Sequence, residues 1–232
     1  MKRSLLVLAL AAAFSPILAH AEAGDWVVRL RAADVSPNED SKLGKTVNNL
    51  GLGTVMSPGA ELEVDNNWIP EFDISYYFTK NIAAELILAL GTRHDVSVRG
   101  DTSGTGVVGN QKLGSVNLLP PTLTAQWHFM PDQTFDPYVG AGVNYTYMLD
   151  RNLKYSQGAL AGTKIKIDSD SWGWALQAGL DINLKDGWLI NADVKYVTID
   201  TDVKTKLGAN WVKVDSLDIN PWIFGVGIGK KF

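Results

Sequence analysis

Hydrophobic and polar side chains alternate with a period of two along much of this 232-residue chain. The clearest case is DSWGWALQAGLDINL, residues 170–184, in which Trp172, Trp174 and Leu176 begin a series of apolar residues at every second position. Small or polar residues such as Gly173, Gln177 and Asp181 lie between them. Because successive side chains of a β-strand point to opposite faces, this pattern predicts a strand with one apolar and one small or polar face.

Seven other segments share this alternation, so the chain is expected to contain eight strands, of eight to fifteen residues each. A strand that crosses a membrane needs about 9–11 residues, and barrels of the bacterial outer membrane have an even number of strands. The predicted strands are residues 26–34, 71–78, 81–90, 119–129, 138–147, 170–184, 187–197 and 220–232.

The connections between these strands alternate in length. Three are short and turn-like, whereas the others are long and rich in Gly, Asn, Asp and Ser. This matches the periplasmic turns and extracellular loops of outer-membrane barrels. The predicted fold is all-β: an eight-stranded antiparallel transmembrane β-barrel with long extracellular loops, short periplasmic turns and both termini in the periplasm. The short connections are residues 79–81, 130–137 and 185–187, and the long ones are 36–67, 93–114, 151–170 and 202–216.

The N-terminal segment has the features of a secretory signal peptide. Lys2 and Arg3 precede the apolar run 5–14, and the small residues of AHA (19–21) form a cleavage site. We therefore expect residues 1–21 to be a cleaved signal peptide and 22–232 a single barrel domain in the outer membrane. A membrane anchor is less favoured because the apolar run is too short to span a bilayer.

The orientation of the two strand faces follows from the charged residues on the small face. Buried carboxylate and guanidinium groups are costly in a dry core unless they are paired. The apolar face is therefore expected to contact lipid, and the charged residues to form a network inside the barrel. The alternative is a soluble sheet protein with a core of aromatic side chains. The expected network residues are Arg29, Arg31, Glu71, Asp73, Glu85, Asp181, Asp193 and Lys195.

Composition and motifs argue against several other classes of protein. The chain has no cysteine and a formal net charge of −4, so neither disulfides nor nucleic-acid binding are expected. His94 and His128 are the only histidines after processing, and no nucleophile motif, phosphate loop or metal-ligand cluster is present. We expect no enzymatic activity, cofactor or metal. Arg93 and His94 are interpreted as a loop-edge pair near lipopolysaccharide phosphates.

Several stretches, in order along nearly all of the mature chain, resemble the OmpW-type family of outer-membrane proteins. The resemblance implies an eight-stranded barrel associated with uptake of small hydrophobic molecules, related to the alkane-uptake barrels. The terminal Phe232 resembles the C-terminal signal by which the barrel-assembly machinery recognises such proteins for insertion. The matching stretches are GDW (24–26), NIAAELILA (81–89), RH (93–94), LLPPTLTAQWHF (118–129), PYVGAGVNYT (137–146), DSWGWALQAGLD (170–181), GWLINADVKYV (187–197), KLG (206–208) and NPWIFGVGIGKKF (220–232).

Pro120 and Pro121 are candidates for a lateral gate. Neither residue has an N–H group to donate, so two ladder hydrogen bonds would be missing where they stand in a strand. The resemblance implies that a ligand enters at the outside and leaves sideways through the barrel wall, and such a gap would let it pass. A bulge or bend without a gating role is the alternative.

Two sets of residues are candidates for contact with a substrate. Inward parity suggests that one set lines an apolar patch in the upper or middle lumen, and the other set lies in the first long loop. The alternative for the first set is that its side chains simply fill the lumen. The alternative for the second set is that the loop packs against itself. The lumen candidates are Tyr77, Ile87, Leu189, Lys195 and Val197, and the candidates for a loop funnel are Leu50, Leu52, Val55 and Met56.

Two functions remain open on the sequence alone. One is a conduit for passive uptake of small hydrophobic molecules, which enter at the extracellular end and leave through the barrel wall. The other is a structural or interaction barrel with a plugged lumen, whose loops bind phage, colicin or host surfaces. In either case the expected surroundings are outer-membrane lipid and lipopolysaccharide.

Overall fold

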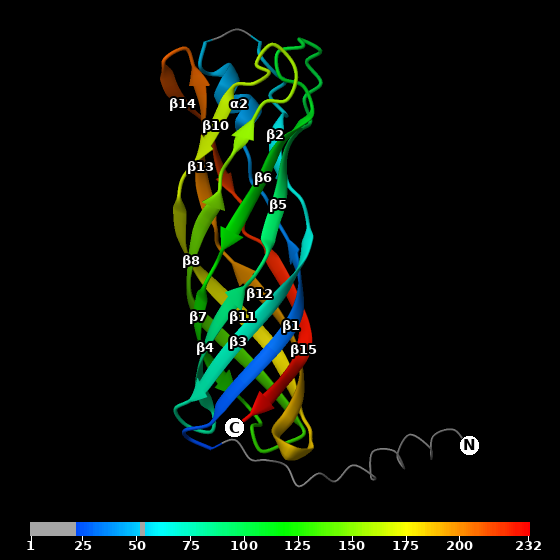
Figure 1. Ribbon diagram of the computed structural model, residues 1–232, viewed down its shortest axis with the longest axis vertical. Coiled ribbons are helices and arrows are strands. Elements are labelled where there is room, and N and C mark those ends of the chain that lie inside the picture. The colour runs from blue at the N-terminus through cyan, green and yellow to red at the C-terminus, as the bar shows by residue number, and fades with distance from the viewer. Residues whose placement is uncertain (1–21, 52–53) are drawn as a thin grey trace, which may run out of the picture.

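The computed structural model of the protein describes residues 22–51 and 54–232 (Figure 1). The predicted signal peptide, residues 1–21, and the funnel candidate Leu52 lie outside the described residues. Most of the described chain is in strands. No helix within the described ranges is long and apolar enough to cross a membrane.

Eight strands close into an antiparallel barrel, which confirms the predicted fold class. Around the wall they follow the order β1, β3, β4, β7, β8, β11, β12 and β15. Pairing of β8 with β11 and of β1 with β15 closes the sheet on itself. The bounds are β1 Trp26–Ser36, β3 Asn67–Tyr77, β4 Ile82–Ala89, β7 Thr122–His128, β8 Phe135–Asp150, β11 Asp170–Asn183, β12 Trp188–Val197 and β15 Trp222–Lys231.

The long connections are more regular than the sequence pattern suggested, since they contain further strands and a helix. Their apolar residues also alternate, as at Ile165 and Ile167, but the runs are short and are separated by glycine-rich turns. These strands extend the wall beyond the barrel at the end that carries the long connections (Figure 1). They are β2 Glu61–Val64, β5 Thr92–Arg99, β6 Gln111–Leu119, β9 Leu153–Lys154, β10 Lys164–Ile167, β13 Asp200–Leu207 and β14 Asn210–Asp218, with the helix α2 Leu43–Asn48.

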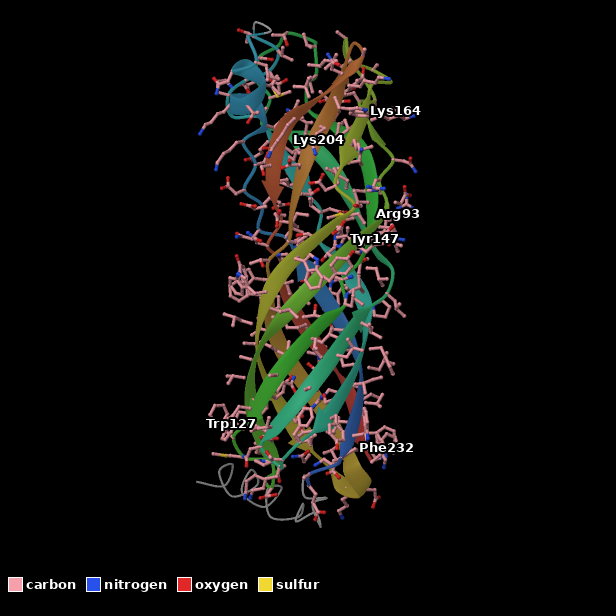
Figure 2. The ribbon with its side chains drawn as sticks, turned by 90° about the vertical axis from the view of Figure 1, so that its left-hand side faces the viewer. Arg93, Trp127, Tyr147, Lys164, Lys204 and Phe232 are labelled. Atoms are coloured by element: carbon pink, nitrogen blue, oxygen red, sulfur yellow. The ribbon has the colours of Figure 1, made fainter. Side chains whose placement is uncertain are left out.

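The outer surface of the barrel is an apolar band between two rings of aromatic side chains. We call the end with the short connections, Trp26 and Phe232 the turn end, and the opposite end the loop end. Figure 2 shows Trp127 and Phe232 near the turn end and Tyr147 where the barrel passes into the loop-end extension. Such aromatic rings mark the two interfaces of a bilayer, so this surface contacts lipid. The turn-end ring includes Trp26, Tyr76, Phe78, Trp127, Phe129, Trp188 and Phe232, and the loop-end ring includes Trp68, Tyr145, Tyr147, Trp172, Trp174, Tyr196 and Trp222.

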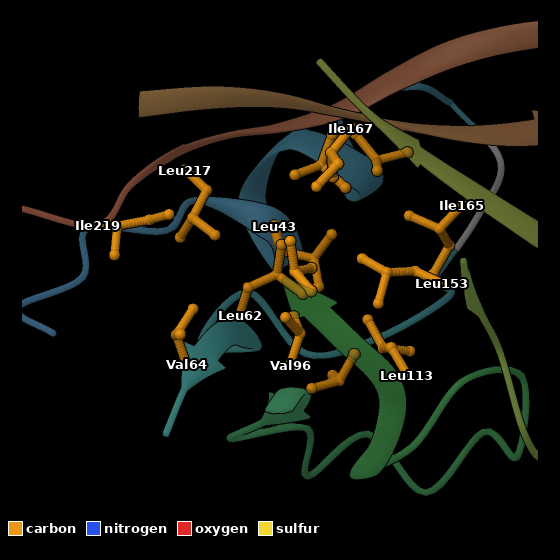
Figure 3. Close-up of a cluster of buried hydrophobic side chains, with 14 of the residues drawn as sticks. Leu43, Leu62, Val64, Val96, Leu113, Leu153, Ile165, Ile167, Leu217 and Ile219 are labelled. Atoms are coloured by element: carbon orange, nitrogen blue, oxygen red, sulfur yellow. The ribbon is translucent and has the colours of Figure 1, made fainter. Parts of the chain in front are cut away.

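The loop-end extension encloses an apolar core of its own (Figure 3). Side chains from β2, β5, β6, β10 and β14 meet there, and α2 adds Leu43 and Val47. The helix packs closely because Gly44 has no side chain: a β-carbon at this position would overlap with the carbonyl oxygen of Ser57. The interior of the molecule is therefore apolar at the loop end and polar within the barrel.

Candidate functional site

A network of ion pairs fills the barrel interior around two arginines of β1. Arg31 places Nη1 3.0 Å from Oε1 of Glu71 and 3.2 Å from a carboxylate oxygen of Asp193, and Nη2 3.0 Å from Oε1 of Glu85. Nη1 also lies 3.2 Å from Oδ2 of Asp73. Both arginine side chains are fully buried.

Arg29 and the neighbouring polar groups complete this network. Arg29 donates to Oε1 of Glu85 at 3.0 Å and to Oδ2 of Asp181 at 2.6 Å. Lys195 donates to Glu71 and to Asp193, at 2.7 Å in each case. The network joins side chains from β1, β3, β4, β11 and β12, and β7 contributes Gln126, which donates to Glu85 at 2.8 Å. We call this set the polar plug, because its side chains are buried and bonded to one another across the barrel interior.

A smaller cluster lies between the polar plug and the turn end. His128 Nδ1 donates to Oδ2 of Asp136 at 2.7 Å, and the Tyr77 hydroxyl donates to Nε2 at 3.1 Å. His128, Asp136 and Asp181 bring metal-ligand atoms within 4.8 Å of one another. Arg29 and Asn191 already donate to Asp181, so the three residues are bonded within the protein. The sequence pattern does not reveal this pairing of His128 with Asp136 across the β7–β8 hairpin.

An apolar cavity of about 50 Å³ lies on the loop-end side of the polar plug. Its floor includes Glu71 and Lys195 of the plug, and its walls are otherwise largely aliphatic. Lys195 thus lines the cavity, and its ammonium group donates to Glu71 of the plug. The other lining residues include Val35, Val64, Ile69, Ile87, Ala89, His94, Leu118, Pro120, Val197, Ile199, Ile219 and Ile223.

Two further apolar cavities lie within the loop-end extension. One, of about 30 Å³, shares Val64, His94, Leu118 and Ile219 with the first cavity. The other, of about 80 Å³, is lined by residues of α2 and the loops, including the funnel candidates Leu50, Val55 and Met56. His94 is buried between the first two cavities and donates from Nδ1 to the carbonyl oxygen of Asp65 at 2.8 Å. Arg93 and His94 were both expected at a loop edge. Arg93 is exposed, whereas His94 is buried.

Asp101 fastens together the loop segments that line the outermost cavity. Its Oδ1 accepts from the backbone N–H of Ser57 at 2.9 Å and of Ser103 at 3.0 Å, and its Oδ2 accepts from Gly109 at 3.0 Å. Burial raises the pKa of Asp101, but these hydrogen bonds together outweigh it, so the pKa lies below the usual range of a carboxyl group.

We expect Asp101→Ala to loosen these loops without unfolding the barrel. Proteolytic cleavage between residues 101 and 110 should rise several-fold at neutral pH, since three backbone donors lose their acceptor. Because the folded-state pKa is lowered, the contribution of Asp101 is present above about pH 4 and fades as the pH falls through that lowered pKa. Limited proteolysis at neutral and acid pH measures both effects. Asp150→Ala is the matched control, since among the described residues the Asp150 side chain accepts only from Asn152. Equal cleavage of both variants would contradict the assignment.

The wall of the barrel is interrupted beside the first cavity. The β4–β7 ladder ends at Ile87↔Thr122, and the β5–β6 ladder begins at Thr92↔Leu118. Between them, no backbone hydrogen bond joins Leu88 or Ala89 to Pro120 or Pro121, all of which the structure describes. The two prolines lie between β6 and β7 rather than within one strand as expected, because neither can continue the ladder.

The opposite side of the barrel has a comparable break that is closed. The chain leaves β12 at Val197 and enters β15 after Pro221. Here Val197 donates to the carbonyl oxygen of Pro221 at 3.2 Å, and Ile219 donates to Ile199 at 2.8 Å. The gap beside Pro120 is therefore a local feature of the wall and not a general consequence of the loop-end extension.

The five lumen candidates occupy two separate places. Ile87, Lys195 and Val197 line the first cavity. Tyr77 and Leu189 lie on the other side of the plug, in a small apolar cluster with Val27 and Ala83 near the turn end. The prediction of a single patch in the upper or middle lumen is therefore wrong for Tyr77 and Leu189. Strand parity identifies which side chains face inward but not how far along the barrel they lie.

Comparisons with known proteins agree with this architecture. The family model described as the OmpW family matches residues 22–232. Outer membrane protein W of Vibrio cholerae serotype O1 is 38% identical over 236 residues, covering 100% of each chain. The crystal structure of OprG from Pseudomonas aeruginosa has a TM-score of 0.76 at 32% identity, covering 92% of this chain and 98% of that one. The solid-state NMR structure of AlkL in DMPC lipid bilayers has a TM-score of 0.64 at 30% identity, covering 92% of each chain. The chain belongs to the OmpW family of outer-membrane β-barrel proteins.

Proposed function

We propose that the protein is a non-catalytic conduit for passive uptake of small hydrophobic molecules across the outer membrane. The observation that carries this proposal is the position of the interrupted wall: Ala89 and Pro120 line both the gap and the apolar cavity. The polar plug closes the straight path toward the turn end. A hydrophobic ligand that has entered the cavity from the loop end therefore has one apolar route onward. This route leads sideways into the lipid, between β4 and the Pro120–Pro121 segment.

The proposed direction of transport follows from the two ends of the barrel. The loop end faces the outside of the cell, where its apolar cavities receive the ligand. The turn end and both termini face the periplasm, as expected for a chain that keeps its N-terminus there after signal-peptide cleavage. The start of β1 lies beside the C-terminal residue, since the backbone N–H of Trp26 donates to the carbonyl oxygen of Phe232 at 3.1 Å.

Two partners belong to this proposal. Lipopolysaccharide and phospholipid surround the apolar band, and the barrel-assembly machinery recognises β15 with its terminal Phe232 during insertion. The side chain of Phe232 is 71% exposed and lies at the turn end, where a second protein can reach it.

The proposal is tested by closing the gap covalently. The chain has no cysteine, so Ala89→Cys with Pro120→Cys provides a unique pair that oxidation or a short bis-maleimide reagent can join. The matched control is Ala84→Cys with Ala125→Cys, two residues paired on the same β4–β7 ladder where it is intact. Uptake of a hydrophobic fluorescent probe is measured in cells that lack the native protein and produce each variant.

We expect joining of the gap pair to reduce uptake to the level of cells without the protein, and reduction of the disulfide to restore it. The variant with the control pair should take up the probe equally well whether its two cysteines are joined or reduced. If the variant with the joined gap pair takes up the probe at the wild-type level, the proposed lateral exit is wrong. Equal uptake with and without the protein would remove the conduit altogether, and the plugged barrel would then be better explained as a receptor for phage, colicin or host surfaces.

A further inference from the structure

The outward face of the β9–β10–β13–β14 sheet carries lysines directly opposite one another. Lys164 of β10 is paired with Lys154 of β9. Lys166 is paired with Lys204 of β13, which is itself paired with Lys213 of β14. The β10–β13 register, continued by one residue, places Lys164 opposite Lys206. Six lysines thus form two adjacent rows across four strands, which we call the lysine rows.

Acidic residues neutralise only part of the lysine rows. Lys213 lies 2.5 Å from Oδ1 of Asp202, and Lys204 lies 3.2 Å from Oδ1 of Asp168. Asp168, Asp202 and Asp200 all lie toward the barrel edge of this sheet. The remaining lysines form no ion pair with any residue that the structure describes; these are Lys154, Lys164, Lys166 and Lys206.

This arrangement is unfavourable for the isolated protein. Like charges directly opposite one another on neighbouring strands destabilise a sheet. The chain as a whole carries a formal net charge of −4, so an excess of basic residues does not explain the rows. An external anion with several charged groups would convert the repulsion into attraction.

The position of the lysine rows indicates which anion meets them. Only Asp168 and Ser169 separate β10 from β11, so the sheet continues the barrel wall directly beyond the aromatic ring at Trp172. Figure 2 shows Lys164 and Lys204 farther along the long axis than Tyr147. With the loop end outside, this height corresponds to the sugar layer above the lipid head groups. Trp211, 44% exposed and paired with Lys206, adds a flat aromatic surface of the kind that packs against a sugar ring.

We propose that the lysine rows bind the phosphate- and carboxylate-bearing core sugars of a neighbouring lipopolysaccharide molecule. The charges are complementary, and a ligand whose lipid part is anchored beside the barrel is held at high local concentration. The binding surface lies outside the barrel wall and is separate from the cavities. The proposal rests on the orientation given above but not on uptake, so failure of either test leaves the other unaffected.

The test compares two variants that lose the same number of charges. Lys154, Lys164, Lys166 and Lys206 are all replaced by glutamine in the first, and Lys42, Lys45, Lys80 and Lys185 in the control. The control lysines are exposed and lie outside this sheet. Each protein is purified in detergent micelles and titrated with rough lipopolysaccharide, which has core sugars, and with lipid A, which has none. Thermal unfolding is recorded with and without each lipid.

We expect the first variant to bind rough lipopolysaccharide at least about ten-fold more weakly than wild type, with a smaller dependence on salt. The control should stay within about two-fold of wild type, and lipid A should not distinguish the proteins. Without lipid, the first variant should unfold no earlier than wild type, because its substitutions remove repulsion. Rough lipopolysaccharide should then raise the unfolding temperature of wild type but not of this variant.

Three outcomes would overturn the proposal. The first is wild-type affinity of the first variant for rough lipopolysaccharide. The second is equal affinity of wild type for lipid A and rough lipopolysaccharide, which would leave the core sugars without a role. The third is a clear preference of wild type for a soluble polyanion such as polyphosphate, which would assign the lysine rows to a different partner.

Discussion

Arg31→Ala is expected to lower the free energy of unfolding by about 3–5 kcal/mol, the usual cost of breaking a buried ion pair from one side. The guanidinium of Arg31 contacts carboxylates of β3, β4 and β12 and is fully buried. Its removal leaves those carboxylates close together, with only Arg29 and Lys195 to neutralise them. Because the partners remain buried, the lost attraction is not replaced by bulk water.

Urea unfolding in lipid vesicles, followed by tryptophan fluorescence, measures this effect. Arg99→Ala is the control, since Arg99 is exposed and forms only a 3.6 Å contact with Glu63; we expect it to change the free energy by less than about 0.5 kcal/mol. A similar result for both variants would mean that water enters the lumen freely and takes the place of Arg31. The polar plug would then be a wet passage, and the argument for a sideways exit would lose its premise.

Val226→Arg is expected to destabilise the barrel by about 2–4 kcal/mol, the cost of a charged side chain on the lipid face near the middle of the bilayer. Val226 lies on β15 between Trp222 in the loop-end ring and Phe232 in the turn-end ring, and its side chain is 56% exposed. Its neighbours across the sheet are Ala32 and Ala192, which are too small to cover the new side chain. The cost therefore comes from the surrounding hydrocarbon rather than from disturbed packing.

The same substitution at the edge of the apolar band provides the control. Ile82 faces outward beside Trp127 in the turn-end ring, and Ile82→Arg is expected to cost only about 0–1 kcal/mol because the guanidinium reaches the interface. Reversible unfolding in the same vesicles compares the two variants. Equal stability of Val226→Arg and wild type would mean that this surface does not contact hydrocarbon.

The eight barrel strands were predictable because one physical constraint acts along their whole length. Lipid on one side and a packed polar interior on the other require strict alternation, and segments such as 170–184 show it over many residues. The charged inward face of β1 follows from the same alternation, so Arg29 and Arg31 could be placed inside the barrel before their partners were known.

The loop-end strands and the cavities were not predictable in the same way. β10 has only four residues, too few for a periodic signal to stand out from a polar loop. Which residues share a cavity depends on how far along the barrel each one lies, and parity gives no depth. For this reason Leu189 could be assigned to the interior but not to the correct side of the plug. The gap in backbone hydrogen bonding beside Pro120 also depends on where the β4–β7 ladder ends. The two prolines in the sequence do not reveal that position.

The polar plug has a consequence for how the chain assembles. Arg31 and Asp193 are 162 positions apart in the chain, and Arg29 and Asp181 are 152 apart. A partly synthesised or partly inserted chain therefore holds incompletely neutralised charges on its concave side, and a nascent sheet gains the pairs with Asp181 and Asp193 only when β1 meets β11 and β12 across the lumen. High contact order slows such a reaction, and the late electrostatic gain makes its final step all-or-none, so half-assembled sheets should be short-lived and difficult to isolate.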